Sequence, residues 1–329
     1  MVRISIVLRT MLLVALALAV AACGPSVGGS GGETEDYPSE DIRLIVQAEA
    51  GGTSDLTART AAGIAEKKLG TNIVVENRPG AAGSIAMKQV ASAQPDGYTL
   101  GYLPVEVSML QYLGYDVKPS DYAMIAQGVQ VPATLTVRAD SPYETMEDFV
   151  RAAKEQPNQM SVGNSGPGSI WHAATGAVEQ EAGVELEPVP FDGGAPAAAA
   201  LIAGDLDAVT VGVGEVLPGV EAGDLRTLAV LDEKPAPQLP EVPTAKEAGY
   251  EVEVLAWGGF GAPADTPEAV IDELNKAFRE AVESEDYTQA LAETGNQAVY
   301  KGPEEFASYA RSQAEVFGRI IPDLEISQQ

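Results

Sequence analysis

The sequence predicts an α/β protein with parallel sheets, beginning at Ile42. Short apolar runs such as Ile42–Val46 have the length of buried strands, and alanine-rich segments such as residues 56–69 have the length of helices. The two kinds of segment alternate along the chain, which is the pattern that produces parallel sheets. Glycine-rich loops stand at several points where a strand gives way to a helix.

The first of these loops spans residues 48–55. It follows the strand expected at Ile42–Val46, and its two glycines precede Thr53, Ser54 and Asp55, which are residue types common at helix starts. The first N–H groups of a helix have no partner inside it, and the helix dipole makes that end electropositive. We therefore predict that this loop binds a carboxylate.

The same alternation continues to the end of the chain. Further strands are expected at residues 72–76, 98–102, 123–129, 133–137, 160–162, 186–191, 207–213, 225–231 and 253–260. Further helices are expected at residues 84–93, 145–155, 169–181, 196–203, 267–284 and 304–320. In parallel sheets ligands bind beyond the carboxyl ends of the strands, and the glycine loops lie at such ends.

The N-terminus has the features of an export signal. Arg3 and Arg9 precede an apolar run at Met11–Ala22, which is too short and too close to the terminus for a good membrane span. Small residues directly before Cys23 resemble the lipobox of bacterial lipoproteins, in which the cysteine is acylated. The alternative is an ordinary signal peptide whose cleavage site lies beside a cysteine.

We favour lipidation because Cys23 is the only cysteine in 329 residues and therefore has no internal disulfide partner. Residues 1–22 are then a lipoprotein signal peptide. Residues 23–40 are the lipidated cysteine and a flexible tether rich in glycine, serine and acidic residues. Such a tether places a soluble domain near a membrane surface.

The composition is strongly acidic, with 48 Asp and Glu against 20 Lys and Arg and a net charge of −28. This charge argues against binding to nucleic acid and against electrostatic adhesion to anionic lipid. It also repels an anionic ligand at long range, so local donors must overcome the general field. The roughly 290 residues after the tether are enough for two lobes, each with its own core.

Several segments together match one family. They are residues 51–55 with Ala58 and Arg59, and residues 74–83, 95–100, 191–197, 204–207, 225–229 and 240–244. Each motif is weak alone, but their order is highly specific. The chain thus resembles the substrate-binding receptors of tripartite tricarboxylate transporters, also called the Bug family, from about residue 37 to residue 318.

The resemblance implies a two-lobed type II periplasmic-binding-protein fold of the α/β class, with the ligand cleft between the lobes. Lobe 1 would comprise residues 41–138 and 260–329, and lobe 2 residues 139–259. The protein would be extracytoplasmic and lipid-anchored to the cell membrane, in a periplasm or on the outer face of a single membrane. It would deliver a small carboxylate, which could be a dicarboxylate, a tricarboxylate, an amino acid or an aromatic acid, to the large and small membrane subunits of a tripartite tricarboxylate-type transporter.

The family's ligand contacts fall on three loops of this chain. They would be Ala50, Gly51, Gly52, Thr53, Ser54 and Asp55, then Ser165, Gly168, Ser169 and His172, and finally Asp192, Gly193, Gly194 and Ala195. Glu49 and Asp192 depart from the residue types usual there. Either acid would disfavour a highly charged anion if it faced the cleft, and Asp192 could instead pair with an ammonium group.

Other interpretations remain open for some of these residues. Asp55 could simply cap its helix, Ser169 could be only an N-cap, and His172 could lie behind the ligand contacts. A hydrolase could be drawn from Ser165, His172 and Asp192, although Ser165 lacks a Gly-x-Ser-x-Gly frame. We expect no enzyme activity, no cofactor, no metal site, no nucleic-acid partner and a monomer.

The lipidation hypothesis predicts that Cys23→Ser releases the protein from membranes, because the serine hydroxyl takes the place of the thiol that would be acylated. Membrane fractionation of the wild type and the variant measures this. Continued association of the variant with the membrane fraction would contradict the assignment.

Overall fold

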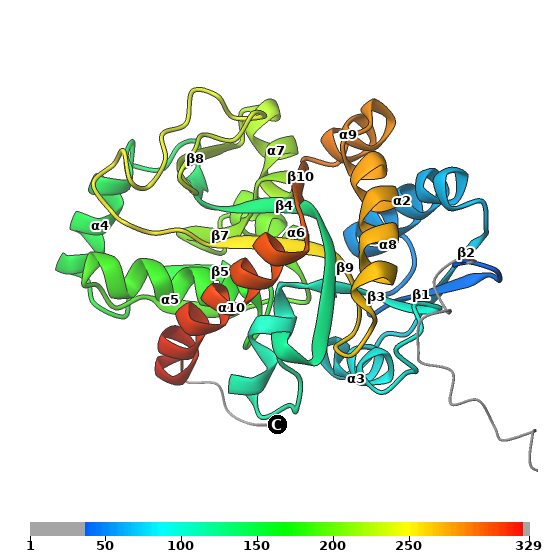
Figure 1. The fold of residues 1–329 in the computed structure, drawn as a ribbon. Coiled ribbons are helices and arrows are strands. Elements are labelled where there is room, and N and C mark those ends of the chain that lie inside the picture. Colours follow the sequence, from blue (N-terminus) through cyan, green and yellow to red (C-terminus); the bar gives the residue numbers. More distant parts are fainter. Residues whose placement is uncertain (1–36, 325–329) are drawn as a thin grey trace, which may run out of the picture. The chain divides into compact units, whose positions relative to one another are not determined.

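The computed structural model describes residues 37–324, so the expected signal peptide, Cys23 and most of the tether lie outside the described residues. Its strands are β1 Ile42–Val46, β2 Ile73–Asn77, β3 Thr99–Pro104, β4 Tyr122–Arg138, β5 Ser161–Asn164, β6 Glu187–Pro190, β7 Ala208–Gly212, β8 Leu225–Leu231, β9 Leu255–Pro263 and β10 Gln297–Lys301. Its α-helices are α2 Thr53–Leu69, α3 Ser84–Ala91, α4 Met146–Glu155, α5 Ile170–Ala182, α6 Gly194–Ala203, α7 Val213–Ala222, α8 Glu268–Val282, α9 Glu285–Ala292 and α10 Pro303–Ile320 (Figure 1).

The strands form one mixed sheet in the order β2-β1-β3-β9-β4-β7-β5-β6, and β8 and β10 pair with β4 as well. The sheet is parallel on both sides, where β1 pairs with β2 and β3, and β5 pairs with β6 and β7. In the middle, β9 and β4 run antiparallel to their neighbours. The α/β class is confirmed, but the sheet is mixed because these two strands run in opposite directions between its halves.

Strand β4 links the two halves. Its first part, Tyr122–Pro132, pairs with β9, and its last part, Ala133–Arg138, pairs with β7 and β8. The sequence pattern predicts two separate strands here, whereas the structure has one strand of 17 residues. Shifts in the β4–β9 register on either side of Gln127 carry the ladder past Gly128. The ladder to β9 ends at Pro132, and the pairing with β7 and β8 begins at Ala133.

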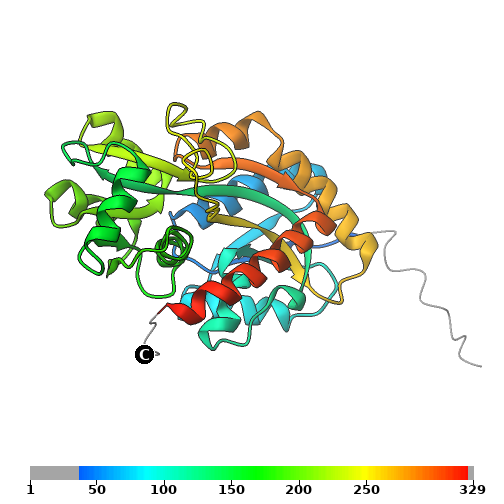
Figure 2. The ribbon, with the colours of Figure 1, turned by 90° about the vertical axis from the view of Figure 1, so that its left-hand side faces the viewer.

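Helices gather around each half of the sheet. In Figure 1, α2, α3, α8 and α9 lie around β1–β3 and β9, and α4–α7 lie around β5–β8. Helix α10, red in Figures 1 and 2, packs against β4 and also against α5 of the second half. Within residues 37–324, no helix combines the length and hydropathy needed to cross a bilayer.

The chain from Pro38 onward forms one compact unit, and the exact lobe boundaries stay a prediction. The strand pairing indicates that the passage from the first half to the second falls inside β4, near Ala133, where its partner changes from β9 to β7. The return passage is made by β9. Two strands therefore cross between the halves.

Helix α8 shows how the sequence pattern builds the core of the first half. Its apolar residues recur at helical spacing and are buried, with Leu274 and Phe278 fully so. The ring of Phe278 packs against that of Phe260 on β9, with 4.3 Å between ring centroids. This contact fixes the helix to one of the two strands that cross between the halves.

We expect Phe278→Ala to lower the free energy of unfolding by about 3–5 kcal/mol, because it removes buried apolar surface and leaves a cavity. Denaturant unfolding followed by circular dichroism measures the change. Lys276→Ala on the exposed face of the same helix is the control, and its effect should stay within about 0.5 kcal/mol. Equal effects for the two variants would contradict the packing described here.

Candidate functional site

A cleft of about 1240 Å³ lies between the two halves of the sheet. The first half contributes Gln47, Thr53, Ser54, Gly80, Ala82, Gly83, Tyr102, Pro104, Val105, Glu106, Leu110 and residues 112–115. The second half contributes Pro167, Gly168, Ser169, Trp171, Gly214 and Glu215, and the crossing strands contribute Val129, Val131, Ala256 and Trp257. Three helices begin at this cleft: α2 after β1, α5 after β5 and α7 after β7.

Helix α2 forms the start of the first wall. Its N-cap is Gly52, so no side chain caps its first amides. Thr53 and Ser54 both line the cleft, and Gln47 Nε2 donates a hydrogen bond of 3.0 Å to Ser54 Oγ. The structure therefore places an electropositive helix end at the cleft.

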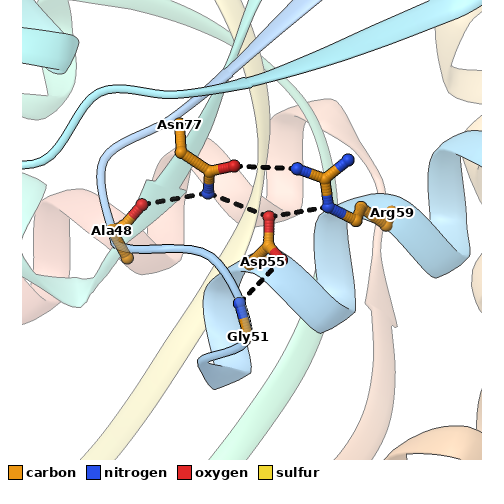
Figure 3. A network of polar contacts seen from close by, with 5 residues as sticks. All are labelled: Ala48, Gly51, Asp55, Arg59 and Asn77. Atoms are coloured by element: carbon orange, nitrogen blue, oxygen red, sulfur yellow. Dashed lines mark hydrogen bonds and ion pairs between the residues drawn. The ribbon is translucent and has the colours of Figure 1, made fainter.

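Asp55 is engaged within the protein (Figure 3). Its Oδ2 accepts from the Gly51 N–H at 2.9 Å, and its Oδ1 accepts from Arg59 Nε and Asn77 Nδ2, both at 2.9 Å. Asn77 Nδ2 also donates to the Ala48 carbonyl at 3.0 Å. Burial alone would raise the pKa of Asp55, but the bonds from Arg59, Gly51 and Asn77 hold it below its ordinary value. The network fixes the loop before α2 and occupies the Gly51 amide.

Helix α5 forms part of the second wall. The Oγ of its N-cap Ser169 accepts from the His172 N–H at 3.1 Å, and the Gly168 N–H donates to His172 Nδ1 at 3.2 Å. Gly168 and Ser169 line the cleft, whereas His172 lies behind them. Burial lowers the pKa of His172, so the ring is neutral at pH 7, as an accepting Nδ1 requires. The histidine positions the loop.

The remaining residues of the expected site flank the cleft without belonging to its lining. They are Ala50, Gly51, Gly52, Asp55, Ser165, His172, Asp192, Gly193, Gly194 and Ala195. Both acids that depart from the family pattern, Glu49 and Asp192, are exposed. Contact of any of these residues with a ligand stays a prediction, and the same holds for the lining residues Thr53, Ser54, Gly168 and Ser169.

Glu215 lines the cleft and was not anticipated from the sequence. It is the third residue of α7, and its Oε2 accepts from the N–H of the N-cap Gly212. Its Oε1 accepts from Trp171 Nε1 at 3.2 Å. The apolar pattern predicts that the preceding strand continues to Val213, and it predicts no helix there. The available signal was a glycine-rich junction after a strand, as at the other two helix starts.

The cleft is acidic in its side chains. Among the described residues that line it, Glu106 and Glu215 are the only carboxylic acids, and there is no Lys, Arg or His. Burial raises the pKa of Glu106, and it raises the pKa of Glu215 to about 7 against the opposing bonds from Gly212 and Trp171. Donors to a bound carboxylate must therefore come from the main chain, from hydroxyls and from indole or amide N–H groups.

A cleft at the strand ends of an α/β sheet is where proteins of this architecture bind small ligands. The chain matches, over residues 57–326, the family described as "Tripartite tricarboxylate transporter family receptor". It belongs to that family, which confirms the resemblance drawn from the motifs. The two-lobed fold class is confirmed as well, and membership in a receptor family confirms that the protein is not an enzyme.

Relatives and solved structures agree with this assignment. The chain is 30% identical over 317 residues to "UPF0065 protein in gbd 5'region" of Cupriavidus necator, covering 95% of this chain and 96% of the relative. A ligand-free crystal structure of a TctC solute-binding protein from Polaromonas is 34% identical, with a TM-score of 0.82, covering 88% of this chain and all of that one. An R. palustris protein solved with adipate is 29% identical, with a TM-score of 0.74, covering 89% of this chain and 99% of that one.

The arrangement gives no support to the hydrolase alternative. The His172 Nδ1 is occupied by the Gly168 N–H, and within residues 37–324 no hydrogen bond joins Ser165, His172 and Asp192. In the same part of the chain, no three His, Cys, Asp or Glu side chains gather as metal ligands would.

We expect Asp55→Asn to lower the free energy of unfolding by about 1–3 kcal/mol at neutral pH, because it removes a buried hydrogen-bonded charge. A folded-state pKa below the ordinary value means that ionised Asp55 stabilises the fold above about pH 3.9 and loses this effect as the pH falls through the lowered pKa. The difference between wild type and variant should therefore shrink in acid. Denaturant titrations across pH measure it.

Glu49→Gln is the control for this variant, because it removes one negative charge from the same loop and makes none of the three bonds to Asp55. It should leave the unfolding free energy nearly unchanged at every pH. A loss in Asp55→Asn that is no larger than the loss in this control would show that the network does not stabilise the loop.

Proposed function

We propose that this protein is a lipid-anchored extracytoplasmic receptor that captures a small carboxylate in its cleft. It hands the ligand to the large and small membrane subunits of a tripartite tricarboxylate-type transporter. The observation that carries the proposal is the convergence of the starts of α2, α5 and α7 on one cleft. The adipate complex of a similar R. palustris protein supports a carboxylate as ligand.

Helix starts suit this task in an acidic protein. Their N–H groups are neutral donors, so they attract a carboxylate without a cationic side chain in the cleft. A hydrogen bond to a charged acceptor contributes about 1.5–3 kcal/mol. Four to six such bonds would reach micromolar affinity, which corresponds to about −8 kcal/mol, after the cost of ordering the ligand.

The lipid anchor and the membrane partners rest on different grounds. The anchor rests on the sequence around Cys23, and the transporter subunits rest on the family to which the chain belongs. Binding in the cleft does not depend on either. The ligand can therefore be sought with the purified soluble part of the chain, starting at the tether.

A thermal-shift screen of mono-, di- and tricarboxylates and amino acids should find ligands that raise Tm, because a ligand that binds only the folded state stabilises it. For such a ligand we expect Gly52→Val to weaken binding at least about tenfold in calorimetry, because its side chain would occupy the space through which the ligand reaches the start of α2. Gly52 has a φ of −81°, and an added Cβ would meet only the Glu49 carbonyl oxygen at 3.8 Å. The variant should therefore fold.

The matched control is Gly63→Val on the exposed face of the same helix, where an added Cβ meets nothing within 4 Å. Its affinity should equal that of the wild type. Unchanged affinity in Gly52→Val would remove the loop before α2 from the site. A screen in which no carboxylate or amino acid raises Tm would overturn the proposed ligand class.

A further inference from the structure

Glu215 is held in the cleft as an acceptor. Its Oε2 accepts from the Gly212 N–H and its Oε1 from Trp171 Nε1, so both oxygens are fixed in place by donors from the protein. A carboxylate offers about four acceptor positions, so these two bonds do not exhaust its capacity, and Glu215 is part of the cleft lining.

The structure makes room for this carboxylate. A Cβ added at Gly194 would collide with the Glu215 carboxylate, and a Cβ at Gly212 would lie 2.6 Å from Oε2. The first turn of α6 and the end of β7 therefore both approach Glu215 at positions that have no side chain.

The rest of the cleft favours positive charge over a second negative one. Glu106 is the only other carboxylic acid in the described lining of the cleft, and no basic side chain belongs to that lining. Five aromatic residues contribute to the walls, among them Trp171 and Trp257. Aromatic faces attract cations, and desolvation strengthens that attraction.

Trp257 lines the same cleft. Its side chain is buried, and its Nε1 has no hydrogen-bond partner among the described residues. Because this nitrogen is itself buried, a ligand oxygen reaches it only if the side chain moves. The helix starts supply the donors for an anionic group, and Glu215 supplies an acceptor for a cationic one.

We propose that Glu215 recognises a protonated nitrogen on the ligand, so that the receptor prefers a zwitterionic amino acid to the dicarboxylate that lacks the amine. This inference rests on the proposed function, in which helix starts hold the ligand carboxylate. Glu215 is then a specificity-determining residue at the start of α7.

The competing arrangement is a protonated Glu215 that donates to a ligand carboxylate. Both carboxylate oxygens already accept hydrogen bonds from N–H groups, which favours the ionised form. A dianionic ligand would also meet the field of Glu106 and of a chain with a net charge of −28. The two arrangements give opposite pH dependences.

The titratable groups around Glu215 are few. Glu106, Tyr102, Tyr112 and Tyr115 line the same cleft, His172 follows Trp171 on α5 with its Nδ1 bonded to the Gly168 N–H, and Asp192 precedes the start of α6 and is exposed. Burial raises the pKa of Glu215 to about 7, so its charge changes near neutral pH, and burial raises the pKa of Tyr102 away from that range. An ammonium contact is therefore lost as the pH falls below 7.

Calorimetry with two matched ligand pairs tests this proposal: aspartate against succinate, and 2-aminoadipate against adipate. We expect the amine-bearing member of at least one pair to bind at least about tenfold more tightly at about pH 8, and this preference to shrink several-fold at about pH 6.

Glu215→Gln keeps an oxygen acceptor and an NH₂ group but cannot ionise. It should abolish both the preference and its pH dependence. Glu221→Gln, on the exposed surface of the same helix, should behave as the wild type.

The possible results distinguish the role of Glu215 from the proposed carboxylate-binding function. A diacid that binds as tightly as the amino acid of the same pair, or whose affinity rises as the pH falls, would overturn the role proposed for Glu215. The proposed function as a carboxylate receptor would not be affected by that result. Failure of all four ligands to bind would count against the proposed ligand class itself. The wild-type pH dependence requires no variant, so the test does not depend on the folding of Glu215→Gln.

Discussion

The antiparallel ladder between β4 and β9 is the interaction on which the rest of this structure depends. It pairs residues from Tyr122 with Pro263 to Pro132 with Leu255. Both strands also carry residues that line the cleft, Val129 and Val131 on one and Trp257 on the other. The ladder thus connects the two halves and contributes directly to the binding site. The helix starts face a common cleft because β4 and β9 hold the two halves of the sheet together.

Much of the fold and part of the site could be predicted from the sequence, since glycine loops between apolar strands and alanine-rich helices are local signals. These signals located the loop and helix start at residues 51–55, between β1 and α2. The internal network of Asp55 was beyond such reasoning, because its partner Asn77 is 22 residues away and arrives only when β1 pairs with β2. Sequence spacing does not reveal which of a capping residue's oxygens are already occupied.

Helix α7 was missed for a different reason. The apolar run of β7 continues without a break into Val213, and no Ser, Thr, Asp or Asn marks the change from strand to helix. The helix is capped instead by Glu215, the third residue of α7, whose side chain accepts a hydrogen bond from the Gly212 N–H. The continuous β4 was divided for a related reason, since Gly128 and Pro132 interrupt its apolar pattern. The ladder to β9 passes Gly128 and ends at Pro132, and pairing with β7 and β8 continues the strand from Ala133.

The close approach of Gly194 and Gly212 to Glu215 has an evolutionary consequence. A methyl group at Gly194 would occupy the place of the carboxylate, so a change there becomes acceptable only after Glu215 has been shortened or replaced. The order of substitutions is therefore constrained, and positions from α6 and α7 should vary together among related chains. A protein lineage that changes its ligand specificity at this part of the cleft would have to replace Glu215 before Gly194 can carry a side chain.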